Sequence, residues 1–117
     1  MARLSTHVLD TAHGRPAAGL RIDFSARDAT GWRLLQTIHT NADGRTDAPL
    51  LQGETIPTGE FQLVFHVGDY FRALRLPLPE PPFVDRVPIH FGIADARAHY
   101  HVPLLCSPWS YSTYRGS

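Results

Sequence analysis

Seven of the 117 residues are histidine, and three of them fall where a side chain could do chemistry on the surface of a sheet. His99 and His101 are two residues apart in an apolar stretch, and side chains with this spacing on a strand point to the same face. His7 lies in an alternating stretch near the N-terminus, on the face opposite Leu4 and Val8. An imidazole acts as base, acid or metal ligand near neutral pH. The spacing therefore predicts three outward imidazoles, although solvated histidines are also common on such faces.

Three kinds of chemistry could use these side chains. His99 and His101, with His7 as a third ligand, would form a zinc site, although no carboxylate or thiol is placed obviously near them. Nucleophilic catalysis is less favoured, because Cys106 ends an apolar stretch as a packed thiol would, and no Gly-x-Ser-x-Gly turn is present. In the third, a histidine activates water for hydrolysis, and Arg45, directly after an Asp-Gly turn, stabilises the anion that forms. Spacing alone leaves all three open.

Composition limits the class of protein. The chain has 117 residues, the size of one domain, so we expect a single domain over 1–117. The formal net charge is zero and no long basic run occurs, so there is no electrostatic reason to expect nucleic acid or an anionic membrane as a partner. The single cysteine excludes a disulfide within the chain and fits a reducing compartment. Neither a signal peptide nor a run of about 20 apolar residues is present, so we expect a cytoplasmic protein without a membrane segment.

Short alternating stretches separated by turn residues must position these side chains. Strands are predicted at 4–10, 20–27, 32–40, 60–67, 87–93, 99–106 and 110–114, with a very short strand at the start of 48–59 and a short helix within 68–76. Five prolines between residues 76 and 88 predict an extended connection, because proline lacks the N–H that a helix or ladder needs. The pattern indicates an all-β fold: an antiparallel β-sandwich of about eight strands with one short helix.

Four segments resemble the transthyretin-like family and, within it, the 5-hydroxyisourate hydrolases of urate breakdown. They are LSTHVLDTAHGRPA at 4–17, HTNADGR at 39–45, HYHVPLL at 99–105 and YSTYRGS at 111–117. The terminal Tyr-Arg-Gly-Ser is the most specific of them. The resemblance implies a transthyretin-like sandwich that hydrolyses 5-hydroxyisourate to 2-oxo-4-hydroxy-4-carboxy-5-ureidoimidazoline, with no metal or organic cofactor. It also implies a homotetramer, a dimer of dimers, with active sites in the clefts where the dimers meet.

The same resemblance implies which residues form the site. The expected catalytic residues are His7, Arg45, His101 and Ser117 with its carboxylate. The expected substrate-binding residues are those of the terminal signature and last strand, namely Ser112, Tyr114, Arg115 and Gly116. Either histidine could take the proton of the attacking water, and the sequence does not assign which. Because Ser117 would be a working part of the site, an extension after it is expected to be harmful.

Two other functions remain as alternatives. One is a transthyretin-type carrier of a small hydrophobic ligand in a central channel; such carriers have lysine where His7 stands, and their last strand continues further. The other is an immunoglobulin-like interaction domain, which the lack of a cysteine pair and of a signal peptide disfavours. The expected partners are therefore the small-molecule substrate and further copies of the same chain.

Overall fold

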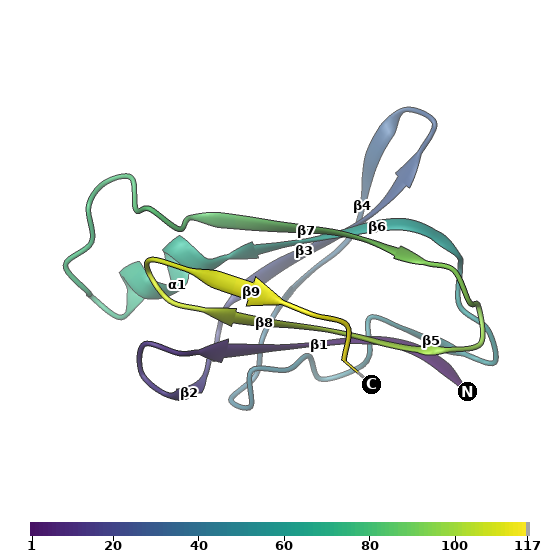
Figure 1. Cartoon of the computed structure of the whole chain (residues 1–117), viewed down its shortest axis with the longest axis horizontal. Coiled ribbons are helices and arrows are strands. Elements are labelled where there is room, and N and C mark those ends of the chain that lie inside the picture. Colours follow the sequence, from purple (N-terminus) through teal and green to yellow (C-terminus); the bar gives the residue numbers. More distant parts are fainter. Residues whose placement is uncertain (117) are drawn as a thin grey trace.

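The computed structural model describes residues 1–116, which form two facing sheets and one short helix (Figure 1). The first sheet has the order β2-β1-β8-β9, with β5 also paired to β1, and the second has the order β4-β3-β6-β7. The elements are β1 (Ala2–Asp10), β2 (Arg15–Pro16), β3 (Arg21–Asp28), β4 (Gly31–His39), β5 (Leu51–Gly53), β6 (Gly59–His66), α1 (Val67–Ala73), β7 (Arg86–Ile93), β8 (His99–Cys106) and β9 (Tyr111–Thr113). The predicted β-sandwich with one short helix is confirmed.

The observed strands lie within two residues of the seven longer predicted ones, and β8 has the predicted bounds. Two features differ. Arg15 and Pro16 form the short strand β2 inside the predicted loop 11–19, because two residues are too few to show alternation. In addition, β1 and β8 pair in parallel, whereas the prediction was an antiparallel sandwich. Alternation shows which face a side chain takes, but it carries no information on the direction of a partner strand far away in the sequence.

The inward faces of β1 and β8 form one side of the core. Leu4 and Val8 of β1 and Leu104 of β8 have no measurable exposure, and Tyr100 and Val102 are also buried. Burial of each large apolar side chain contributes about 1.5–3 kcal/mol to stability. Because this alternation is fixed by the core, the intervening residues of both strands must lie on the outer face of the first sheet.

The helix α1 closes one end of the sandwich. Val67, Tyr70 and Phe71 are buried, and the hydroxyl of Tyr70 donates to Oδ2 of Asp10 at 2.8 Å, so the helix is tied to the end of β1. At the opposite end of β1, the tail after β9 runs back along β8 (Figure 1). Within residues 1–116, no helix is long and apolar enough to cross a membrane.

Candidate active site

The parallel register of β1 and β8 places the polar residues of both strands side by side on the outer face of the first sheet. Ser5 lies opposite His101, and His7 lies opposite Pro103. The hydroxyl Oγ of Ser5 is 2.8 Å from Nδ1 of His101. The structure therefore brings His7 and His101, which are far apart in the sequence, onto neighbouring strands and the same face.

A tight turn places Arg45 beside His7. Oδ1 of Asn41 accepts hydrogen bonds from the backbone N–H groups of Asp43 at 2.9 Å and Arg45 at 3.1 Å, an arrangement typical of an Asx turn. The carbonyl of Gly44 accepts from the backbone N–H of Val8 at 2.8 Å, and Arg45 forms an isolated antiparallel bridge with His7. The turn is thus attached directly to β1 at the position of the histidine.

Gly44 is required at the point of attachment for two reasons. Its φ is 74°, in the left-handed region that side chains with a Cβ rarely adopt. A Cβ on this residue would also lie 2.4 Å from the carbonyl oxygen of Val8. The Asp-Gly pair of the sequence therefore serves both the bend of the turn and its close approach to β1.

The C-terminal tail closes the other side of His101. The backbone N–H of Gly116 donates to the carbonyl of His101 at 2.8 Å, and the two residues form an isolated bridge. A Cβ on Gly116 would lie only 2.7 Å from Cδ2 of the imidazole. Glycine at this position therefore lets the backbone lie against the ring. Ser117, an expected catalytic residue, lies outside the described residues.

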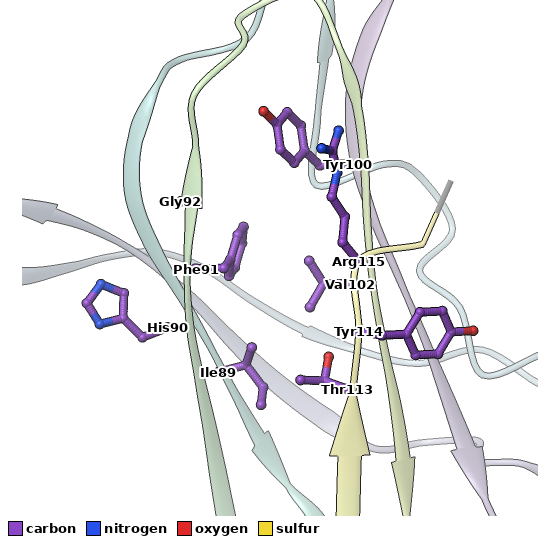
Figure 2. A pocket seen from close by; sticks show the side chains of 9 residues that line it. All are labelled: Ile89, His90, Phe91, Gly92, Tyr100, Val102, Thr113, Tyr114 and Arg115. Atoms are coloured by element: carbon purple, nitrogen blue, oxygen red, sulfur yellow. The ribbon is translucent and has the colours of Figure 1, made fainter.

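The side chains of Arg115, Tyr114 and Ser112, which were also expected to bind substrate, do not all point to the same place. The guanidinium of Arg115 lies 4.2 Å from the ring centre of Tyr100 and donates to the carbonyl of His99 at 3.2 Å. Figure 2 shows Arg115 beside Tyr100, at the groove between β7 and the β8–β9 edge, while Tyr114 points away from that groove. Ser112 is exposed and lies opposite Leu105, which places it on the outer face with the histidines.

Burial and the charge of Arg45 lower the pKa of both site histidines. For His7, partial burial is the larger cause and Arg45 the second, and together they outweigh a backbone hydrogen bond with Asp43 that raises the pKa. For His101, burial is again the first cause, followed by the charges of Arg45, His7 and Arg3. Because a free histidine titrates near pH 6.5, a lowered pKa favours the neutral, proton-accepting form of both rings at pH 7.

A model of the HIUase/Transthyretin family matches residues 4–116 of the chain. The chain belongs to this family. It is 59% identical over 115 residues to 5-hydroxyisourate hydrolase 2 of Rhizobium meliloti, covering 98% of this chain and 96% of the relative. The structure of Klebsiella pneumoniae 5-hydroxyisourate hydrolase matches with a TM-score of 0.82 and 33% identity over all of both chains. The structure of (S)-allantoin synthase matches with a TM-score of 0.92 and 41% identity over 99% of this chain, which spans 44% of that protein.

In this family member, a polar hollow lies next to His101. It is lined by Arg3, Ser5, Arg45, His99, Tyr100 and His101. Arg3 is not among the site residues expected from the sequence, because the first strand was predicted to begin at residue 4. The signal was nevertheless present, since Arg3, Ser5 and His7 follow one another with the period of two that defines one face of a strand.

The single cysteine and three further histidines do not take part in this site. Burial raises the pKa of the Cys106 thiol to about 12, so this cysteine is a packed thiol rather than a nucleophile. His13, His66 and His90 each pair with a carboxylate, at 2.7, 2.9 and 2.8 Å respectively. Over residues 1–116, no three side chains of histidine, cysteine, aspartate or glutamate are arranged to hold a metal ion.

Proposed function

We propose that this chain is a 5-hydroxyisourate hydrolase and that its active site is the outer face of the first sheet around His7, Arg45 and His101. Family membership and the hydrolases among its relatives support the reaction. The observation that carries the site is the attachment of the Arg45 turn to β1 beside His7, one strand away from His101. Two neutral imidazoles and one fixed cation are the groups that a water-dependent ring opening needs.

The chemistry follows from these groups. The oxygen of a water molecule attacks a carbonyl carbon of the six-membered ring, and His7 or His101 takes a proton from that water. Arg45 stabilises the negative charge on the carbonyl oxygen. When the anion collapses, the ring C–N bond breaks and the proton passes to the departing nitrogen. The carbonyl carbon becomes a carboxylic acid, which loses its proton to water and gives the carboxylate of the ureidoimidazoline product, and the imidazole is neutral again.

The tail contributes to this site in two ways. Gly116 and Arg115 fix the tail against β8 through the carbonyls of His101 and His99, so they act on the substrate by shaping its surroundings. Ser112 and Tyr114 are exposed, and we infer that they line the substrate cleft on the outer face. Ser117, with its carboxylate, would orient Arg45 or a histidine.

We also infer that the working form is a cytoplasmic homotetramer, a dimer of dimers, of single-domain subunits. The outer face that carries the histidines also holds apolar side chains, with Leu9 opposite Leu105 and with Tyr114 60% exposed. Apolar surface beside a polar site is typical of an interface between subunits. A second subunit would cover this face and turn the open hollow into a closed cleft.

Turnover of the intermediate tests the function directly. Urate oxidase acting on urate generates 5-hydroxyisourate, and its ultraviolet absorbance is followed with and without this protein. We expect the protein to accelerate the loss of absorbance well beyond the spontaneous decay. No acceleration would exclude the hydrolase, and ligand binding without turnover would favour the carrier alternative.

A further inference from the structure

The imidazole of His101 has a hydrogen-bond partner on the neighbouring strand that the proposed reaction does not yet use. Ser5 lies directly opposite His101 in the parallel register, and its Oγ is 2.8 Å from Nδ1 of the ring. Both residues are half-buried, so water competes weakly for this contact. The hydroxyl of Ser5 thus occupies the Nδ1 edge of this imidazole.

The C-terminal tail contacts the imidazole of His101 on the side away from β1. Gly116 is bonded to the backbone of His101 at 2.8 Å, and its Cα lies so close that an added Cβ would be 2.7 Å from Cδ2 of the ring. Because β8 lies between β1 and β9, the imidazole is enclosed by Ser5 on one side and by the tail on the other. These contacts hold the ring in one orientation. With Nδ1 bonded to Ser5, Nε2 is the nitrogen that can face the cleft.

We propose that Ser5 is a positioning residue that holds His101 with its proton on Nδ1, so that Nε2 carries the lone pair that receives a proton from water. Because Ser5 occupies Nδ1, Nε2 is the nitrogen left for the substrate, and a neutral imidazole that accepts a proton at Nε2 carries its own proton on Nδ1. The oxygen of the serine hydroxyl then accepts the hydrogen bond from this N–H. This role rests on the proposed hydrolysis, in which His101 exchanges a proton with the attacking water.

The tautomer of His101 tests the proposal without any turnover. Protein labelled with nitrogen-15 at histidine is studied by NMR at a pH of about 8, where the ring is neutral, and His101→Gln identifies the resonances of His101. We expect the proton on Nδ1 in the wild type and a shift of population towards Nε2–H in Ser5→Ala. A proton already on Nε2 in the wild type, or a tautomer unchanged in Ser5→Ala, would overturn the assignment.

Kinetics supply the second readout. We expect Ser5→Ala to lower kcat by about tenfold with little change in KM, because proton transfer is impaired while substrate contacts remain. Ser5→Thr keeps the hydroxyl and should restore most of the rate, and Thr58→Ala, which removes an exposed hydroxyl before β6, serves as the control. Full activity of Ser5→Ala, or an equal loss in Ser5→Thr, would contradict the role. If the wild type itself does not accelerate ring opening, the proposed function fails, while the tautomer result still stands.

Discussion

Three influences act on the pKa of both His7 and His101. Each ring is partly withdrawn from water, and each experiences the positive charge of Arg45, so the neutral form of each is favoured. Each also has a backbone hydrogen bond, with Asp43 and Ser5 respectively, that acts in the opposite direction. The net effect lowers both pKa values, so both rings can accept a proton near pH 7. Arg45 beside them can stabilise the negative charge that forms on the substrate.

The pH dependence of turnover follows from these shifts. Both pKa values lie below the ordinary histidine value near 6.5, so the neutral, proton-accepting form persists to lower pH than in a free histidine. We expect kcat/KM to be level around neutral pH and to fall only below about 6.5. A profile whose acid limb lies clearly above that value would contradict the assignment of a neutral histidine as the base.

Arg45→Gln tests the cause of these shifts. Without the guanidinium, the pKa of both His7 and His101 should rise, because Arg45 is the second cause of lowering at His7 and the first charge that lowers the pKa of His101. NMR titration of the histidine ring protons measures both values independently of activity. If neither pKa changes in the variant, Arg45 does not lie beside the two rings in solution.

At the scale of elements, the Asn41–Arg45 turn and the tail bring their residues to strands β1 and β8. Gly44 anchors the turn, since it combines a φ of 74° with a close approach to the carbonyl of Val8. Gly116 performs the corresponding task for the tail, where it lies against the ring of His101. At both positions a side chain would collide with a neighbouring group, and at Gly44 the backbone conformation also favours glycine.

Substitution of Gly44 separates these two requirements. Gly44→Ala should lower the free energy of unfolding by about 2–4 kcal/mol, from left-handed strain together with the clash at Val8. Gly14→Ala is the matched control, because Gly14 has a φ of 65° but no atom within 4 Å of an added Cβ, so only the cost of about 1–2 kcal/mol for the conformation applies. Urea unfolding measures both values. Equal losses in the two variants would mean that the close approach contributes nothing.

Gly116→Ala should impair catalysis more than stability. The added methyl would push the tail away from the ring of His101 or rotate the ring, while the core is untouched. We expect kcat to fall by about tenfold or more with a thermal midpoint close to that of the wild type. A fully active variant would show that the tail does not restrain His101.

The sequence predicted most of the elements but not their assembly. Alternation located β1 and β8 and their faces, because the core enforces a period of two on both. It could not reveal that the two strands run parallel, nor that Ser5 therefore faces His101, because register between distant strands depends on the whole sheet. The proximity of Arg45 to His7 came only from the family resemblance, since a turn signal predicts a bend and not what the bend packs against.

At the scale of the molecule, the first sheet has an outer face that is chemically mixed. The hollow beside His101 is polar, whereas Leu9, Leu105 and Tyr114 add apolar surface to the same face. In a monomer this site would be open to water, which weakens every electrostatic contact within it. Association of subunits over this face would exclude water and strengthen the effect of Arg45 on the reacting oxygen.

A charge on this face should separate the subunits. We expect Tyr114→Glu to shift the sedimenting species from tetramer towards smaller forms and to lower activity, because a carboxylate would be buried in the interface. Leu34→Glu is the matched control: Leu34 is 59% exposed against 60% for Tyr114, but it lies on β4 of the second sheet. An unchanged assembly in Tyr114→Glu, or an equal change in both variants, would place the interface elsewhere.

The rate of 5-hydroxyisourate hydrolysis by His7→Ala, Arg45→Ala and His101→Ala tests the central claim most directly. Each variant removes one group from the outer face and none from the core, so each should remain folded by circular dichroism. We expect each to lower kcat/KM by about 100-fold or more, the usual contribution of a general base or an anion-stabilising group. Folded variants that all retain activity within about twofold of the wild type would contradict the account, because the reaction would then take place elsewhere on the molecule.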